Sequence, residues 1–209
     1  MLRLLGELIA GSPHNLVSRR DRGDVLGLHL RECAALAGVL PAGVGERWID
    51  IGTGGGLPGL VLALCRPDTG WTLLDATLKK AEAVRCFAST LGLENVQVLH
   101  GRAEELAHQQ GMRGQFNGAV TRAVGPLPVV MELSRGFVAS GGTIAAVRGR
   151  RHATEVEASH RAAHLLHIRD IQTVQVQSTA REAWLVTMHA DGPTPSQYPR
   201  KTGFRTKPL

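Results

Sequence analysis

The sequence has few cysteines and lacks any long apolar run. Only three of its 209 residues are cysteine, Cys33, Cys65 and Cys86, and their scattered positions match neither a disulfide framework nor a paired-ligand zinc site. No segment has about 18 consecutive apolar residues, and the first ten positions already include Arg3 and Glu7. We therefore expect a cytoplasmic protein without a signal peptide or a membrane span.

Several catalytic motifs are also missing. The sequence contains no P-loop, no GxSxG motif and no HExxH motif. His160, His164 and His167 share the face of a predicted helix, but no cysteine or carboxylate pattern completes a metal site. We therefore expect no bound metal, and hydrolase chemistry is disfavoured.

Acidic residues are outnumbered by basic ones. The chain has 24 Lys and Arg against 18 Asp and Glu, a net charge of +6 and a sequence pI of about 9.9. This balance suits a polyanion such as nucleic acid, although a GC-rich genome would produce the same abundance of arginine. Hydrophobic residues make up 43% and charged residues 20%, which is typical of a folded globular protein.

Short apolar runs alternate with helix-length segments through the middle of the chain. This order predicts an α/β fold with a doubly wound, mostly parallel sheet. The predicted parallel strands are Arg47–Ile51, Trp71–Asp75, Val96–His100, Asn117–Thr121 and Thr143–Val147. Two further runs predict an antiparallel hairpin at the sheet edge, Thr173–Gln177 and Trp184–Met188. In the second helix, Thr77 is expected to cap the free N–H groups at the start. One face of this helix is apolar and comprises Leu78, Ala81, Val84, Ala88 and Leu91.

The two ends of the chain differ from this central domain of residues 46–191. Residues 1–45 have apolar positions at helical spacing, broken by a polar stretch around Ser18–Gly23, and predict a small helical cap. Residues 192–209 hold four of the ten prolines and no acid, which predicts an extended basic arm unable to pack a core. We expect its cations and aromatic rings to bind RNA, with a solvated tail as the alternative.

The most specific local signal is a glycine-rich loop after the first predicted strand. Residues 50–59 read DIGTGGGLPG, and such glycines let the backbone turn sharply and approach a ligand at the start of a helix. Residues 54–59 also match the dinucleotide pattern GxGxxG, a weak signal alone. Asp50 would repel a pyrophosphate but suit the ammonium and sulfonium groups of S-adenosylmethionine. We expect S-adenosylmethionine, with an NAD-dependent oxidoreductase as the alternative.

Charged residues also follow the next predicted strands. Asp75 ends the second strand, where an acid can bind a ribose diol or cap a helix. Glu104 follows the third strand, where an adenine ring would lie, and could equally be a first-turn acid that favours the helix dipole. Arg122 follows the fourth strand at the carboxyl edge of the sheet, where ligands bind in this architecture.

Together these segments resemble the RsmG (glucose-inhibited division protein B) family. The likeness rests on GTGGGLPG at 52–59, LLD at 73–75 with lysines at 79 and 80, GRAEE at 101–105 and TRA at 121–123. It continues at NLVS (15–18), GG (141–142), RG (148–149) and YPRK (198–201), and so covers nearly the whole chain. Three residues depart from the family pattern: Asn117 and Arg148 stand where the family has Asp and Lys, and Glu32 stands at a usual aspartate position.

The resemblance implies a class I, Rossmann-like methyltransferase that uses S-adenosylmethionine to methylate N7 of a guanine (position 527) in 16S rRNA or in the 30S subunit. The residues and the resemblance together predict cofactor contacts at Gly52, Gly54, Gly56, Leu57, Asp75, Ala103, Glu104 and Arg122. The RNA-binding candidates are Asn15, His29, Arg148, Arg200, Lys201, Arg205 and Lys207. We expect a monomer.

The implied reaction explains why no catalytic base is recognisable. Guanine N7 has a free lone pair and no proton, so methyl transfer to it needs alignment and electrostatics rather than proton removal. An inactive RNA-binding protein with the same fold is the remaining alternative. A methyl-transfer assay separates it from the enzyme.

Overall fold

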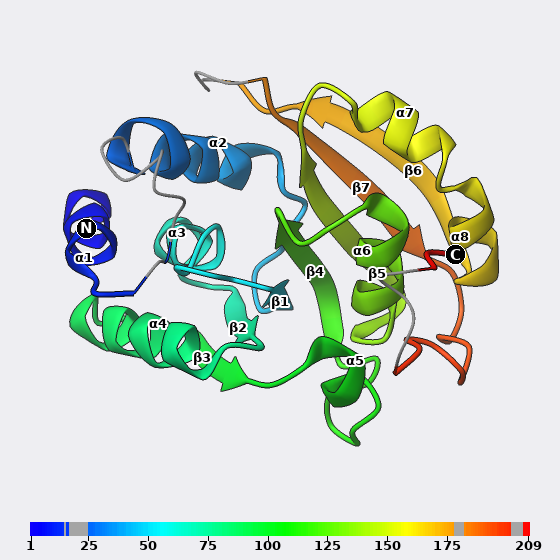
Figure 1. The fold of residues 1–209 in the computed structure, drawn as a ribbon, viewed down its shortest axis with the longest axis horizontal. Coiled ribbons are helices and arrows are strands. Elements are labelled where there is room, and N and C mark those ends of the chain that lie inside the picture. Colours follow the sequence, from blue (N-terminus) through cyan, green and yellow to red (C-terminus); the bar gives the residue numbers. More distant parts are fainter. Residues whose placement is uncertain (15, 17–24, 178–181, 202–206) are drawn as a thin grey trace.

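The computed structural model describes all residues except 15, 17–24, 178–181 and 202–206. Within this part of the chain, seven strands form one sheet with helices on both faces (Figure 1). The strands are β1 (Arg47–Ile51), β2 (Gly70–Asp75), β3 (Val96–His100), β4 (Phe116–Arg122), β5 (Val138–Arg148), β6 (Ile168–Gln175) and β7 (Trp184–Ala190).

The strand order is β3-β2-β1-β4-β5-β7-β6. Strands β1 to β5 pair in parallel, and the register places Ile49 beside Thr72 on one side and Ala119 on the other. Strand β7 pairs antiparallel with both β5 and β6. The predicted doubly wound sheet with an antiparallel edge hairpin is therefore confirmed. Because strand order reverses next to β1, the carboxyl ends of β1 and β4 flank the switch point where ligands bind in such sheets.

Two strands begin five residues earlier than predicted. β5 begins at Val138 rather than Thr143, and β6 begins at Ile168 rather than Thr173. In β5 the adjacent Gly141 and Gly142 hide the strand pattern, and the pairing register with β4 shifts there. In β6 a second register shift, between Arg169 and Gln172, has the same effect.

Helices cover the sheet in two groups (Figure 1). The helices are α1 (Leu2–Gly11), a π-helical turn η2 (Val25–Leu30), α2 (Arg31–Val39), α3 (Gly59–Cys65), α4 (Leu78–Thr90), α5 (Ala103–Leu106), α6 (Leu127–Arg135), α7 (His152–Glu157) and α8 (His160–Leu165). One core cluster joins α1 to α4 with one sheet face, and a second joins α5, α6 and α8 with the other. No helix in the described part of the chain is long and apolar enough to cross a membrane.

The second predicted helix, α4, has the expected apolar face with two corrections. Ala81, Val84 and Ala88 are buried, whereas Leu78 is 50% exposed. Thr77 occupies the N-cap position, but its side chain makes no capping hydrogen bond. The backbone N–H of Thr77 instead donates to Asp75 Oδ1.

The predicted N-terminal helices are present as α1, η2 and α2, while the polar stretch around Ser18–Gly23 lies outside the described residues. Arg66, just after α3, donates hydrogen bonds to the carbonyls of Ala37, Leu40 and Ala42. These bonds fix the end of α2 against the sheet domain.

The C-terminal residues 192–200, here called the C-terminal strap, do not form the predicted extended arm. Arg113 donates to the carbonyl oxygens of Thr194, Pro195 and Tyr198, and the Tyr198 side chain is buried. The arm prediction is therefore wrong for this segment. Composition suggested an arm because the segment has few aliphatic residues, but backbone carbonyls rather than apolar side chains hold it.

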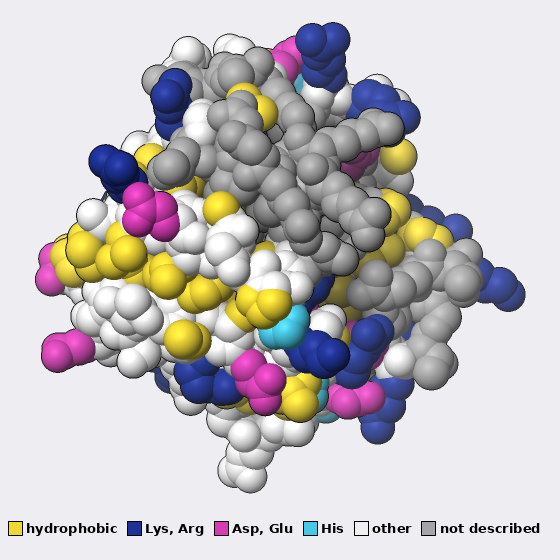
Figure 2. Space-filling view, turned by 60° about the vertical axis from the view of Figure 1, so that its left-hand side comes forward, with side chains coloured by type: hydrophobic (Ala, Val, Ile, Leu, Met, Phe, Trp, Pro, Cys, Tyr) yellow, Lys and Arg dark blue, Asp and Glu magenta, His cyan; other side chains and the backbone are white. Residues whose placement is uncertain are grey.

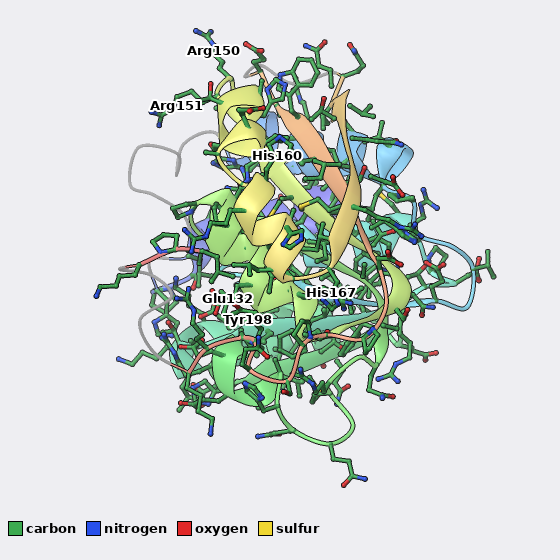
Figure 3. The ribbon with its side chains drawn as sticks, turned by 90° about the vertical axis from the view of Figure 1, so that its right-hand side faces the viewer. Glu132, Arg150, Arg151, His160, His167 and Tyr198 are labelled. Atoms are coloured by element: carbon green, nitrogen blue, oxygen red, sulfur yellow. The ribbon has the colours of Figure 1, made fainter. Side chains whose placement is uncertain are left out.

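Buried charges on α6 explain why the strap is held. Glu132 is fully buried and accepts hydrogen bonds from the backbone N–H, Nε and Nη2 of Arg200, at 2.7 to 2.8 Å. Arg135 is also fully buried and donates to the Gly192 carbonyl and the Thr194 hydroxyl. Burial lowers the pKa of Arg135 to about 10. In Figure 3, Glu132 and Tyr198 lie near each other, where the strap passes α6.

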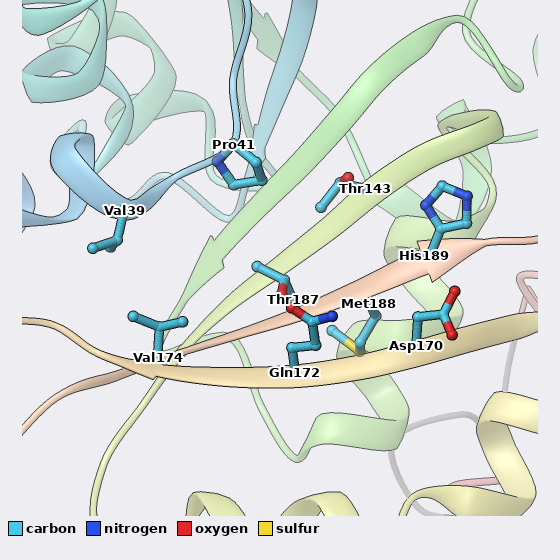
Figure 4. A pocket seen from close by; sticks show the side chains of 9 residues that line it. All are labelled: Val39, Pro41, Thr143, Asp170, Gln172, Val174, Thr187, Met188 and His189. Carbon is cyan, nitrogen blue, oxygen red and sulfur yellow. The ribbon is translucent and has the colours of Figure 1, made fainter.

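Two hollows lie outside the carboxyl edge of the sheet. A groove of about 560 Å³ separates α1 from α4, on the face where Figure 2 shows apolar side chains gathered. A second hollow, of about 400 Å³, lies on the sheet face of β5, β7 and β6 beside the end of α2 (Figure 4). It is lined by Val39 and Pro41 from the end of α2 and by mixed polar and apolar strand residues.

Candidate functional site

The glycine loop between β1 and α3 adopts a conformation that requires glycine. Gly52, Gly54 and Gly56 have φ angles of +73°, +60° and +88°. The backbone N–H groups of Gly52 and Thr53 both donate to the carbonyl of Leu74, at 2.8 and 3.0 Å, so the loop is fixed to the end of β2. The predicted turn after the first strand is therefore present. Leu57 is buried at the end of this loop.

Asp50 is enclosed by this loop. Its Oδ2 accepts hydrogen bonds from Thr53 Oγ1 at 2.7 Å and from the Gly59 N–H at 2.9 Å, whereas Oδ1 is buried without a partner. Burial raises the pKa of Asp50 to about 6, against the lowering effect of these two hydrogen bonds. The carboxylate thus organises the loop from inside.

Asp75 lies at the end of β2 beside the loop, as predicted. Its Oδ2 accepts from the Gly54 N–H at 2.9 Å and its Oδ1 accepts from the Thr77 N–H at 2.8 Å. Each carboxylate oxygen has a further lone pair, so these bonds leave acceptor capacity for two hydroxyl groups. Asp75 therefore both anchors the loop and fits a vicinal diol.

A narrow hollow opens beside these residues. Its walls come from the ends of β1 and β2, the turn after β3 and the turn after β4, and they include Ile51, Gly52, Leu74, Ala103, Glu104 and Val124. Glu104 is buried, and its Oε1 pairs with Arg102 at 2.8 Å. Apolar walls with one carboxylate at the rim suit a flat heteroaromatic ring that carries an amino group.

Arg122 ends β4 and faces the N-terminal helices. Its Nε donates to Glu32 Oε1 at 2.8 Å, and its Nη2 makes a short hydrogen bond with His29 Nδ1. Burial alone would lower the pKa of Arg122, but the neighbouring Cys33, Glu32 and Asp50 raise it above its ordinary value. Sequence reasoning proposed Arg122 for the cofactor and His29 for RNA, but it did not foresee that they touch.

The side chain of Arg148 is largely buried. Its side chain is only 9% exposed, and its Nη1 donates to the Gly125 carbonyl at 2.7 Å. Nε and Nη2 are buried without a hydrogen-bond partner, although Glu155 lies 3.6 Å from Nε. Packing places this guanidinium under the turn after β4, and a role of Arg148 in RNA binding stays a prediction. The adjacent Arg150 and Arg151 are exposed and project outward (Figure 3).

The remaining RNA candidates fall in different places. Arg200 is paired with Glu132, so its guanidinium is largely occupied, whereas Lys201 and Lys207 are exposed. Asn15 and Arg205 lie outside the described residues. The unusual Asn117 accepts a hydrogen bond from the Arg47 N–H, at the amino end of β1 and therefore away from the carboxyl edge.

A buried thiol, Cys33, lies next to Glu32 on α2. Burial raises the pKa of Cys33 to about 12, so its thiol remains protonated at neutral pH. Across the described ranges, no three His, Cys, Asp or Glu side chains gather closely enough to hold a metal ion.

The geometry fits S-adenosylmethionine better than NAD. At two glycines around the site the backbone packs too closely against a neighbouring side chain to leave room for a Cβ. A Cβ on Gly52 would lie 2.9 Å from Val124 Cγ2, and one on Gly101 would lie 2.8 Å from Leu106 Cδ1. Asp75 offers acceptors for a ribose diol, and the buried, partly unpartnered Asp50 carboxylate provides negative charge under the loop. That charge favours a cationic ligand and opposes a pyrophosphate.

Comparison with known proteins identifies the family. Residues 3–184 match the family model of GidB, rRNA small subunit methyltransferase G. The chain is 36% identical to the ribosomal RNA small subunit methyltransferase G of Deinococcus radiodurans, over 98% of this chain and 82% of that protein. It is 32% identical to the protein of the same name from Syntrophomonas wolfei, over 94% of this chain and 91% of the relative.

Solved structures agree on the fold. A SAM-dependent O-methyltransferase from Thermotoga maritima superposes with a TM-score of 0.59 at 15% identity, covering 92% of this chain and 72% of that chain. Cofactor-bound Rv0187 from MTB gives a TM-score of 0.59 at 18% identity, covering 91% and 88%. The fold is thus that of class I S-adenosylmethionine-dependent methyltransferases, and the predicted oxidoreductase alternative finds no support. With the family match spanning most of its length, the chain belongs to the GidB family of rRNA small subunit methyltransferases.

Proposed function

We propose that this protein transfers a methyl group from S-adenosylmethionine to N7 of a guanine in 16S rRNA. The observation that carries the proposal is the glycine loop, held by Asp50 and Asp75 at the carboxyl ends of β1 and β2, in a chain that matches the rRNA methyltransferase family over residues 3–184. We further propose that the enzyme acts as a monomer. An rRNA substrate supports a cytoplasmic location.

The proposed cofactor contacts follow the wall of the site. Gly52, Gly54, Gly56 and Leu57 form the loop over which the amino-acid part of the cofactor would lie. Asp75 would accept hydrogen bonds from the ribose hydroxyls. The adenine would enter the hollow lined by Ala103 and Glu104, and Arg122 would close the site at the end of β4.

The chain's own groups supply orientation rather than proton transfer. When bound, S-adenosylmethionine supplies an electrophilic methyl group on a sulfonium centre. The fixed loop and Asp75 restrict where that methyl group points, and the apolar walls exclude water. Asp50 provides negative charge under the glycine loop, beside a reaction centre that would stay cationic throughout, since the product guanine carries the charge that the sulfonium loses.

RNA contacts are proposed from exposed cations. Arg150 and Arg151 project from the turn after β5, and Lys201 and Lys207 are exposed near the C-terminus. Phosphate oxygens attract such groups without sequence preference. The His29 imidazole is buried against Arg122, which removes it from this set in the described conformation.

The deciding experiment is a methyl-transfer assay. Purified protein is incubated with labelled S-adenosylmethionine and either naked 16S rRNA or 30S subunits from cells that lack this protein, and N7-methylguanine is mapped. Methylation of one guanine is the expected result. Binding of RNA and of S-adenosylhomocysteine without any transfer would identify an inactive relative, and binding of NAD instead would refute the cofactor assignment.

A further inference from the structure

A polar cluster joins the N-terminal helices to the end of β4. Glu32 lies in the first turn of α2 and His29 in the last turn of η2, and both contact Arg122, which is 90 and 93 residues away along the chain. A guanidinium has donors only, so Glu32 Oε1 and His29 Nδ1 must both be the acceptors. The neutral His29 ring therefore carries its proton on Nε2.

The cluster is largely shielded from water. The side chains of Arg122 and Glu32 are 19% and 13% exposed, and His29 is buried. Two of the three guanidinium nitrogens are thus occupied from the side of the N-terminal helices. For the third, Nη1, the described residues provide no acceptor.

The end of β4, where Arg122 lies, adjoins β1 and the glycine loop that follows it. Arg122 ends the strand next to β1, and its charge interacts with Asp50 inside the glycine loop. An arginine side chain has several rotatable bonds, and two acceptors at fixed angles to its plane remove most of that freedom. The plane is therefore set before any ligand arrives.

We propose that Glu32 and His29 are positioning residues, which hold Arg122 so that Nη1 is presented to the cofactor. This inference rests on the proposed function of Arg122. It makes the N-terminal helices part of the cofactor site although they contact the cofactor through another residue. The competing explanation is that the cluster only docks α2 and η2 on the sheet.

Substitutions of His29 separate these explanations. His29→Ala removes the acceptor, whereas His29→Asn keeps one, because the amide oxygen of asparagine and Nδ1 of histidine are both bonded to Cγ. We expect His29→Ala and Glu32→Ala each to weaken S-adenosylhomocysteine binding about tenfold in calorimetry, as expected for losing a hydrogen bond to a charged group. His29→Asn should stay within about twofold of the wild type. Glu7→Ala, which breaks an exposed ion pair with Arg3, is the control and should change nothing.

A double-mutant cycle tests whether His29 acts through Arg122. Arg122→Ala should weaken S-adenosylhomocysteine binding, and adding His29→Ala should then cause no further loss. An equal further loss in the Arg122→Ala background would overturn the proposal. So would an unchanged affinity in folded His29→Ala and Glu32→Ala proteins with lowered melting temperatures, because the cluster would then be a docking contact.

Further outcomes keep the inference separate from the proposed function. If the wild type fails to bind S-adenosylhomocysteine, the proposed function itself fails. If the wild type binds but Arg122→Ala binds equally well, the positioning role is refuted while the methyltransferase assignment stands. Should the alanine variants fail to fold, Glu32→Leu and His29→Leu, which fill space but have no acceptor, replace them: weaker binding by both, with binding of His29→Asn within about twofold of the wild type, supports the proposal, and unchanged binding by both refutes it.

Discussion

Replacing Asp50 by asparagine tests how the buried carboxylate under the glycine loop behaves. The fold raises the pKa of Asp50 from 3.8 to about 6, mainly through burial. The protonated form is therefore favoured in the folded state, so this contribution to stability is complete below pH 3.8 and is lost as the pH rises through about 6. The full displacement corresponds to about 3 kcal/mol at pH 8. About half of it is expected between pH 5 and pH 8.

Asp50→Asn should remove this pH dependence. The amide oxygen can still accept from Thr53 and Gly59, while the amide N–H₂ takes the place of the unpartnered Oδ1 and costs about 1–3 kcal/mol as an unsatisfied donor. At pH 8 the variant is therefore expected to match the wild type or to exceed it by up to about 2 kcal/mol. Urea unfolding of both proteins at pH 5 and pH 8 measures how the free energy of unfolding changes with pH. Contributions from groups that the two proteins share cancel in the difference.

Cofactor binding provides the second measurement. If the Asp50 charge attracts the ammonium group that S-adenosylhomocysteine shares with the cofactor, S-adenosylhomocysteine should bind the wild type more tightly at pH 8 than at pH 5, and this gain should vanish in Asp50→Asn. If the free energy of unfolding changed equally with pH in both proteins, burial would not raise the pKa of Asp50 as argued. A strongly destabilised variant with unchanged cofactor affinity would show that the carboxylate only holds the loop.

Four further outcomes are expected. Asp75→Ala should weaken S-adenosylhomocysteine binding by about 1–3 kcal/mol in calorimetry, since it removes the proposed ribose acceptor and the anchor of the Gly54 N–H; unchanged affinity would rule out the ribose role. Gly52→Ala should destabilise the fold by about 1–3 kcal/mol and reduce cofactor affinity, whereas Gly45→Ala, with a similar positive φ but open space around it, should affect stability alone. Glu132→Ala should lower the free energy of unfolding by about 3 kcal/mol because it leaves Arg200 and the strap unpaired, and equal stability in urea titrations would contradict the strap assignment. Replacing both Arg150 and Arg151 by alanine should flatten the dependence of log K on log salt for RNA binding by about 2 while S-adenosylhomocysteine affinity stays constant; identical slopes would exclude these arginines as phosphate contacts.

Local pattern predicted the sheet and the glycine loop well, because both depend on neighbouring residues. Alternating apolar runs identify β1 to β4, and the glycines at 52, 54 and 56 occupy backbone conformations that side chains disfavour. Local pattern does not show interactions between distant residues. Nothing near Arg148 in the sequence shows that Gly125 and Glu155 enclose it, and nothing near Arg200 indicates Glu132, 68 residues earlier.

The Arg122 cluster shows the same limit for the site. His29, Glu32 and Arg122 were each notable as single positions, but their mutual contact depends on how η2 and α2 cross the end of β4. Helices and strands can be predicted from regularly spaced apolar residues, but an ion pair between distant residues has no such pattern in the sequence. Only the three-dimensional arrangement distinguishes a cation that faces RNA from one whose donors are already shared between a histidine and a glutamate.

The C-terminal strap has a consequence for how the chain is made. Glu132 and Arg135 are synthesised well before residues 192–200, so during translation the Glu132 carboxylate lacks Arg200 and Arg135 lacks its contacts with Gly192 and Thr194. A chain that stops before residue 192 would leave the Glu132 carboxylate without these donors and Arg135 with only the carbonyls of Val138 and Leu166, and we expect it to be less stable. An affinity tag is therefore best joined beyond residue 200, so that the strap keeps its contacts with α6.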